Sequence, residues 1–415
     1  MLQIKTSYEK RQTAGDYGEE NSAVAEIIKN VRARGDAALF EYAKKFDNAD
    51  LNKDNIRVTE SEILRACETA DPELLKTLLR VKTNVLGYHE RQMKEKEGGF
   101  DGETGWKFVP VKRAGLYVPG GLAAYPSSVL MCALPAAAAG VGDITLVTPN
   151  VKNPLVLVAA KLCGVNKIYK IGGAHAIAAL AYGTESVGRV DVIAGPGNIY
   201  VTLAKKAVFG DVGIDMLAGP SEICVLADDT ASSEYVIADL LSQAEHGPLG
   251  ESVLVTTSRR LAEDVASNIR VAAGTAARRG IIENALDGDN FRIILTENTS
   301  QALAVVNEIA PEHLEICAED ARELSKRVYN AGVIFIGRYT PVAVGDYFAG
   351  PSHVLPTGGN SRFSSVLSVD TFLKRISLVG YNKERLAEAA PDIVNAALAE
   401  GFDAHAQSVN VRLKE

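Results

Sequence analysis

From Arg113 onward, short runs rich in valine, isoleucine and leucine alternate with alanine-rich helical segments. A first round contains DITLVTP, KIYKIGG and VDVIAGPG as strand candidates, and a second contains EICVLADD, SVLVTTS, FRIILTE and VIFIG. Helical patterns such as HAIAALAYG and SEYVIADLLSQAEHG separate them. This alternation is typical of βαβ units, which build largely parallel sheets. We therefore predict an α/β protein with two such units in tandem.

Two other segments flank these rounds. Residues 21–92 are charged and have a helical period, most clearly in ENSAVAEIIKNVRARGDAALFEYAKKF. A Gly/Pro-rich loop, TPVAVGDYFAGPSHVLPTGG, follows VIFIG, and the chain ends with ERLAEAAPDIVNAALAEGFDAHAQSVNVRLKE. We expect a helical entry region and a small, mainly helical C-terminal piece.

Length and composition exclude several classes of protein. With 415 residues, of which 47% are hydrophobic and 23% charged, the chain can bury a large core and divide into two or more domains. The net charge is -8 and the basic residues are scattered, so we expect no nucleic-acid partner. Proline and glycine interrupt every apolar run, so we expect no membrane span. The N-terminal segment lacks the apolar stretch of a secretory signal, which favours a cytoplasmic protein.

A metal site is one hypothesis for the polar residues at the ends of these elements. Gln243 and His246 stand three residues apart in SQAEHG, a spacing that places side chains on one side of a helix. Asp346 in VGDYFAGPSH offers a carboxylate, and His405 a second imidazole, so the four could form a nitrogen and oxygen set suited to zinc, manganese or cobalt. The competing interpretation is a hydrogen-bonding helix end at Gln243 and a turn-forming residue at Asp346.

The segment APEHLEI places a carboxylate beside an imidazole. Pro311 suits the first turn of a helix, which predicts Glu312 and His313 near the positive end of that helix. Two adjacent proton acceptors with different pKa values suit a two-stage reaction. The alternative is an acidic helix start followed by a partly buried histidine.

Glycine turns after two predicted strands offer a nucleotide site. In VDVIAGPGNIYVTLAKK, Gly195 and Gly197 match the first two glycines of the dinucleotide fingerprint, but Tyr200 replaces the third. GLYVPGG is a second strand and glycine turn, with Tyr117 available to stack on a ring. Both segments are equally compatible with ordinary strand-to-helix turns.

Taken together, eight motifs resemble the histidinol dehydrogenase family in order and spacing. They are GLYVPGG, AYPSSVLM, GPGNIYV, DMLAGPSE, SQAEHG, APEHLEI, GDYFAGPSHVLPTGG and EGFDAH. The resemblance implies a zinc-dependent oxidation of L-histidinol to L-histidine through the aldehyde, with two NAD, as the last steps of histidine biosynthesis. It also implies one zinc per subunit, held by Gln243, His246, Asp346 and His405.

The resemblance assigns further roles residue by residue. His313 would take the substrate's hydroxyl proton, and Glu312 would activate water to attack the aldehyde. NAD would be bound through Tyr117, His175 and Asn198, although the family often has glutamine where this chain has His175. The residues implied to contact substrate are Ser221, Gln243, His246, His313, Asp346, His353, Glu400 and His405.

The family fold implies two incomplete Rossmann-like domains with parallel sheets plus small, mainly helical terminal pieces. Residues 1–20 would form an N-terminal arm, residues 21–112 and 222–365 the first domain with the catalytic residues, and residues 113–221 the NAD-binding domain. Residues 366–415 would reach the partner subunit of a homodimer, so that Glu400 and His405 act in the partner's active site. The resemblance assigns no role to His89, and we interpret it as structural.

Three other functions compete with this one. A related zinc and NAD-dependent dehydrogenase could oxidise another polar alcohol, such as a sulfonated diol. A cysteine nucleophile at Cys132 or Cys317 is a second alternative, but the five cysteines are widely spaced, form no CxxC pair and are typical of reduced, buried thiols. A non-catalytic binder of metal or amino acid is the third, and the intact Glu312 and His313 argue against it.

Overall fold

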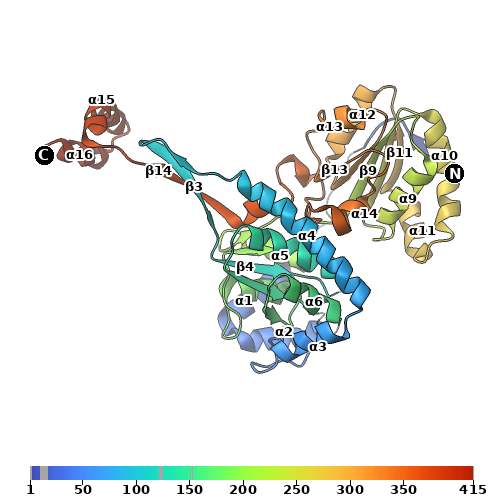
Figure 1. The fold of residues 1–415 in the computed structure, drawn as a ribbon, viewed down its shortest axis with the longest axis horizontal. Helices are drawn as coiled ribbons and strands as arrows, with labels where there is room; N and C mark the ends of the chain where they lie inside the picture. Colours follow the sequence, from blue (N-terminus) through green and yellow to red (C-terminus); the bar gives the residue numbers. More distant parts are fainter. Residues whose placement is uncertain (1, 10–16, 121–124, 150, 152, 415) are drawn as a thin grey trace. The chain divides into compact units, whose positions relative to one another are not determined.

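The computed structural model describes residues 2–9, 17–120, 125–149, 151 and 153–414. The chain forms two compact units, one made of residues 1–93 and 111–372 and the other of residues 94–110 and 373–415. Figure 1 labels the elements of both units. None of the described helices is long and apolar enough to cross a membrane.

The larger unit contains two parallel sheets (Figure 1). The five-stranded sheet has the order β6-β5-β4-β7-β8, with strands Arg113–Tyr117 (β4), Asp143–Val147 (β5), Lys167–Tyr169 (β6), Val192–Ala194 (β7) and Gly213–Ile214 (β8). The six-stranded sheet has the order β1-β11-β10-β9-β12-β13, with strands Ile4–Lys5 (β1), Glu222–Ala227 (β9), Glu251–Thr256 (β10), Phe291–Leu295 (β11), His313–Cys317 (β12) and Val333–Ile336 (β13). The predicted α/β fold with two parallel sheets is therefore confirmed.

Each sheet reverses its strand order once. From β4 the chain proceeds outward to β5 and β6, then returns to place β7 on the other side of β4, and β9 to β12 repeat this path. Such a reversal is the switch point at which open α/β sheets bind ligands. The two sheets thus have switch points between β4 and β7 and between β9 and β12.

Helices connect the strands of both sheets. Those of the five-stranded sheet are Pro126–Ala138 (α5), Pro154–Leu162 (α6), Gly173–Tyr182 (α7) and Ile199–Val208 (α8). Those of the six-stranded sheet are Ser233–Ala244 (α9), Arg259–Ala273 (α10), Arg279–Asp287 (α11), Thr299–Ile309 (α12) and Ala321–Ser325 (α13). After β13 come Val342–Val344 (α14), a π-helical turn at Gly345–Ala349 (η1), and short helices at Asn360–Arg362 (η2) and Val369–Phe372 (η3).

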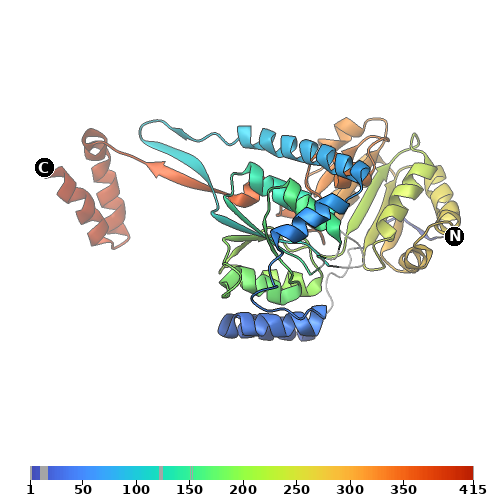
Figure 2. The same ribbon diagram turned by 60° about the horizontal axis from the view of Figure 1, so that its bottom comes forward.

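The N-terminal helices pack on the five-stranded sheet's helices. Those that do so are Gly18–Arg34 (α1), Asp36–Asp47 (α2) and Glu60–Thr69 (α3), and Pro72–Lys94 (α4) follows them in the chain. Val31 of α1 and Leu39 of α2 share one apolar cluster with Ile177 of α7 and Val201 of α8. Figure 2 shows the blue N-terminal helices next to the green helices of this sheet. The grouping of residues 21–112 with residues 222–365 in one domain stays a prediction.

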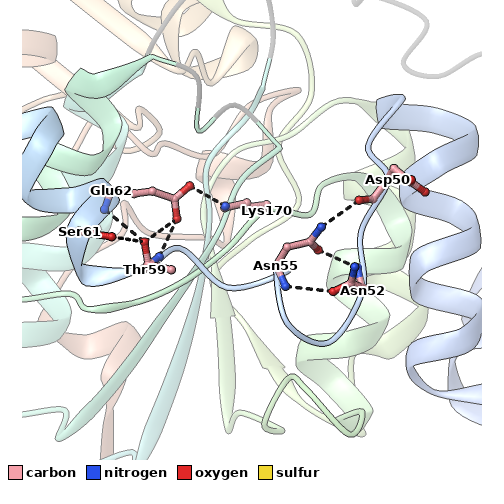
Figure 3. Close-up of polar contacts among 7 residues, drawn as sticks. All are labelled: Asp50, Asn52, Asn55, Thr59, Ser61, Glu62 and Lys170. Atoms are coloured by element: carbon pink, nitrogen blue, oxygen red, sulfur yellow. Dashed lines mark hydrogen bonds and ion pairs between the residues drawn. The ribbon is translucent and has the colours of Figure 1, made fainter.

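A polar network joins α3 to the edge of the five-stranded sheet (Figure 3). The Thr59 side chain accepts the Glu62 N–H, and the Glu62 carboxylate accepts the Thr59 N–H at 2.8 Å, so the two form a capping box. Lys170, which follows β6, donates to the same carboxylate at 2.7 Å. The start of α3 is thus tied to the strand beside it.

The smaller unit contains an antiparallel sheet that the sequence does not reveal. Strand Leu373–Val379 (β14) pairs with Thr104–Pro110 (β3), which also pairs with Gly99–Phe100 (β2). The expected helical C-terminal piece follows as Lys383–Ala399 (α15), Asp403–Asn410 (α16) and Val411–Leu413 (η4). Partners some 270 residues apart in the chain leave no local signal of their pairing.

The prediction that Pro311 opens a helix is wrong. Helix α12 ends at Ile309, and Ala310 has a left-handed backbone with φ of 53°. His313 is instead the first residue of β12, whose neighbours β9 and β13 pair with it on both sides. Pairing with two strands therefore outweighs the helix-start signal of the proline.

Gly195, directly after β7, allows the main chain to pass close to Tyr117 at the first switch point. Its φ is 121°, and a Cβ there would overlap the carbonyl oxygen of Tyr117. We expect Gly195→Ala to lower the free energy of unfolding by more than the ~1–3 kcal/mol of backbone strain alone. Gly210→Ala is the matched control, since Gly210 has a φ of 106° and no atom within 4 Å of its Cβ position. Equal losses in urea unfolding of the two variants would contradict this packing argument.

Candidate active site

One cavity of about 360 Å³ gathers most of the predicted site residues. Its walls come from the turns after β4 and β7, from the residues that precede β9 and β12, and from the segment after α14. The cavity therefore lies at the carboxyl edge of the five-stranded sheet, as expected for such sheets, but at the amino edge of the six-stranded one. The predicted residues that line it are Asn198, Ser221, Gln243, His246, Glu312, His313, Asp346 and His353.

The main chain of Glu222 holds the carboxylate and imidazole of APEHLEI. Its N–H donates to Oε2 of Glu312 at 2.8 Å, and its carbonyl oxygen accepts from Nδ1 of His313 at 2.9 Å. Because Nδ1 carries the donated proton, Nε2 of His313 is left to face the cavity. It lies 3.6 Å from Oδ1 of Asp346.

Burial and neighbouring charges shift the pKa values of both Glu312 and His313. Burial raises the pKa of Glu312 to about 7, against the opposing effect of His313. Burial lowers the pKa of His313, but the carboxylates of Glu312 and Asp346 outweigh it and raise that pKa to about 9. A carboxyl and an imidazole that titrate at and above neutral pH can exchange protons with a substrate.

Three of the four predicted metal ligands line the same cavity. Gln243 lies in the last turn of α9, and its Nε2 is buried with no hydrogen-bond partner among the described residues. His246 follows in the next turn, and burial lowers the pKa of its imidazole, which keeps it neutral as a ligand must be. Asp346 lies in the π-helical turn η1. The three side chains thus offer an amide, an imidazole and a carboxylate to one cavity. This set of nitrogen and oxygen groups fits a zinc ion.

Glu400 and His405 belong to the smaller unit. Glu400 directly follows α15, His405 lies in α16, and both are exposed. Neither is among the residues that line the cavity.

A second cavity of about 650 Å³ contains the three residues predicted to bind NAD. Tyr117 accepts the N–H of Gly173 at 3.2 Å, and burial raises the pKa of its hydroxyl to about 12. The Asn198 side chain caps α8 by accepting the N–H of Val201. Asn198 lines both cavities, so the two meet at the first switch point.

The end of α2 contributes to this second cavity, which the sequence did not indicate. Phe46 stacks on His175 with ring centroids 6.2 Å apart, and Asp47 lies 3.3 Å from Nε2 of His175. Only the amphipathic period of α2 is visible in the sequence, and it does not show which sheet the helix covers.

His353 is held from both ring nitrogens. Nδ1 donates to the carbonyl oxygen of Asp346 at 3.1 Å, and Nε2 lies 3.1 Å from the hydroxyl of Ser128. Burial lowers the pKa of His353, so the ring is neutral. Sequence reasoning missed Ser128, although it lies within the AYPSSVLM motif. His353 thus also supports the turn that carries Asp346.

Neither the cysteines nor His89 is among the residues that line the cavity. Burial raises the pKa of the thiols of Cys132 and Cys317, and neither lines the cavity. A buried, protonated thiol is a poor nucleophile, so the cysteine alternative loses support. His89 is fully buried in α4, where Nδ1 bonds to Oε1 of Gln92 at 2.8 Å.

Paired Rossmann-like sheets, with a buried carboxyl–imidazole pair beside a dinucleotide-type turn, define an enzyme of the dehydrogenase class. The family model of histidinol dehydrogenase matches residues 10–413. The chain belongs to the histidinol dehydrogenase family.

Individual members of the family are similar to this chain over nearly its whole length. The histidinol dehydrogenase of Heliobacterium mobile is 50% identical over 399 residues, which cover 94% of this chain and 93% of the relative. That of Geobacillus kaustophilus is 50% identical over 406 residues, which cover 96% and 95%. A crystal structure of histidinol dehydrogenase from Elizabethkingia anophelis matches with a TM-score of 0.90 and 36% identity, covering 99% of this chain and 94% of that chain.

A buried ion pair supports the turn shared by the two cavities. Lys205 of α8 pairs with Asp215. Lys205 also donates to the carbonyl oxygen of Gly195 at 3.0 Å, while Asp215 accepts the Gly195 N–H at 2.7 Å. The pair therefore fixes the turn that leads to Asn198.

We expect Lys205→Met to lower the free energy of unfolding by ~3–5 kcal/mol, because it leaves the Asp215 carboxylate buried without a counter-charge. The double variant Lys205→Met/Asp215→Asn is expected to recover most of that loss. Urea unfolding of the two single variants and the double variant measures the coupling. Strictly additive losses would show that the two groups do not interact.

Proposed function

We propose that this chain is a zinc-dependent enzyme that oxidises L-histidinol to L-histidine with two NAD, the last steps of histidine biosynthesis. Membership of the family supports the reaction. The observation that carries the proposal is the single cavity in which the Glu312–His313 pair meets Gln243, His246 and Asp346. The adjoining cavity with Tyr117, His175 and Asn198 supports binding of NAD.

Gln243, His246, Asp346 and His405 are the residues that would hold zinc. When bound, the ion would orient the imidazole and amino nitrogens of the substrate as a Lewis acid. Asp346 is also one of the carboxylates that raise the pKa of His313. A cation held by Asp346 would offset that effect and favour neutral His313, whose Nε2 would then act as the base.

Proton transfer in the first oxidation falls to His313. Its Nε2 takes the hydroxyl proton while the alcohol carbon loses hydride to nicotinamide, which leaves the aldehyde. The hydrogen bond from Nδ1 to the Glu222 carbonyl oxygen stabilises the imidazolium that forms. The buried surroundings keep bulk water away from the aldehyde.

The second oxidation needs a water molecule. Glu312 takes a proton from that water as its oxygen attacks the aldehyde carbon, and the protonated His313 gives its proton to the aldehyde oxygen, which yields the hydrate and restores neutral His313. The hydrate then loses its hydride to a second NAD, and His313 again takes the hydroxyl proton. Ser221, His353 and Glu400 are proposed to contact the substrate throughout.

We further propose a homodimer in which the smaller unit completes the partner's site. His405 and Glu400 lie in that unit, whereas the other proposed ligands lie in the larger one. The smaller unit also exposes large apolar side chains, as expected of a surface that another chain covers. These side chains are Phe100, Trp106, Ile376, Val379, Leu398 and Phe402.

A comparison of substrates tests the proposed function. Zinc-loaded protein with NAD is expected to turn over L-histidinol and to leave 2,3-dihydroxypropane-1-sulfonate unreacted. Turnover of the sulfonated diol with indifference to histidinol would favour the related dehydrogenase. A complex of protein, zinc, NAD and histidinol that forms no NADH would favour a non-catalytic binder.

Glu312 is expected to control the second oxidation through its ionisation. A base must be deprotonated, so with the pKa of Glu312 at about 7 the aldehyde step is fast above that pH and is lost below it. We expect Glu312→Gln to slow this step by ~100-fold or more and to remove its pH dependence. Single-turnover NADH formation from histidinol and from histidinaldehyde separates the two steps. Equal slowing of both steps would contradict this division of roles. Glu319 is an exposed acid just after β12, so Glu319→Gln is the control.

Mixed dimers test the shared site. A chain carrying His405→Ala and one carrying His246→Ala are each expected to bind little zinc. A hybrid of the two contains one intact site, if His405 completes the partner's site, and one site with both defects. We expect doubly tagged hybrids to recover about half of the wild-type activity and zinc content. A hybrid as inactive as its parents would place His405 in its own chain's site.

A further inference from the structure

Three neighbouring side chains with potential metal-binding atoms take no part in the mechanism above. One carboxylate oxygen of Asp239, one of Glu315 and Sγ of Cys317 all lie within 4.8 Å of one another. Glu315 is only 1% exposed. Asp239 is partly exposed, but two carboxyl groups this close, one of them fully buried, cannot both be ionised without a large cost, so the pair retains a proton.

Within the larger unit, Glu315 lies on the strand of His313 and contacts the elements that lead to Gln243 and Asp346. Its Oε1 accepts the N–H of Val342 at 2.7 Å, and Val342 opens α14, which leads directly into the turn of Asp346. Its carboxyl group also lies beside Asp239 of α9, one helical turn before Gln243. His313 precedes Glu315 by two residues on β12, so both point from the same face of the sheet.

The protonation state of Glu315 allows it to form hydrogen bonds with both α9 and α14. Burial, followed by the effect of the Asp239 carboxylate, raises the pKa of Glu315 to about 9. Burial also raises the pKa of Asp239. Because Glu315 is the more deeply buried of the two, the retained proton favours its carboxyl group. A neutral carboxylic acid can donate its proton toward Asp239 while it accepts the N–H of Val342.

We propose that Glu315 is a positioning residue of the candidate active site. Its buried carboxyl group holds α9 and α14 against β12, and thereby fixes the elements that carry Gln243, Asp346 and His313. This role rests on the proposed function, because it acts through the residues that would bind zinc and move protons. Residues that orient metal ligands in this way typically affect metal affinity by ~10–100-fold.

Two substitutions at Glu315 test the role. Glu315→Gln is neutral, can donate to Asp239 and can accept from Val342, so we expect zinc affinity and kcat within about threefold of wild type. Glu315→Ala removes both contacts, and we expect its zinc affinity to fall by ~10–100-fold with a matching loss of kcat. Zinc affinity is measured by competition with a chromophoric chelator, and folding by thermal melting of the metal-free protein. Asp239→Ala removes the other side of the contact and replaces Glu315→Ala if that variant does not fold.

Three results would overturn the proposal. Equal zinc loss in Glu315→Gln and Glu315→Ala would mean that a charged carboxylate is needed. A lower melting temperature of Glu315→Ala with unchanged zinc affinity would mean that the residue only stabilises the fold. Two zinc ions per wild-type chain, with one lost in Cys317→Ala, would make the cluster a metal site; we expect Cys317→Ala to bind zinc as wild type does.

The wild-type protein separates this proposal from the proposed function. If it binds no zinc, the proposed function fails before any variant is compared. If it binds one zinc per chain and Glu315→Ala binds zinc equally tightly, only the positioning role fails.

Discussion

The pairing of β12 with β9 determines where the chemistry of this protein can take place. His313 pairs with Ile223, and this register brings the main chain of Glu222 against both members of the Glu312–His313 pair. One peptide N–H and one carbonyl oxygen thus set the carboxylate's position and the imidazole's tautomer. Because these partners belong to the backbone of a central strand, the pair is held by the sheet itself.

The two sheets contribute opposite edges to a continuous site. The five-stranded sheet offers its carboxyl edge, where Gly195 and Tyr117 approach closely and Asn198 caps a helix. The six-stranded sheet offers its amino edge, where β9 and β12 begin. The cavity proposed for NAD and the cavity with the proton-transfer pair meet at Pro119 and Asn198. A hydride acceptor and a base can therefore face one carbon from different sheets.

Sequence periodicity predicted the parallel strands and their helices, because each element is long enough to show its own pattern. Motif order also selected residues that the fold brings to one cavity, including Gln243 and Asp346. Local signals failed where distant pairing decides the structure. Pro311 indicated a helix, yet His313 lies in a strand that pairs with β9 on one side and β13 on the other. The antiparallel pairing of β3 with β14, and the packing of α2 beside His175, likewise depend on partners far away in the chain.

We propose that NAD oxidises the same carbon twice before product leaves, with Glu312 and His313 transferring the protons. The most direct measurement is the number of NADH molecules formed for each L-histidinol consumed by the zinc-loaded protein, with the product identified. We expect two NADH and one L-histidine per histidinol, with no free aldehyde. One NADH per histidinol, with histidinaldehyde released, would contradict it.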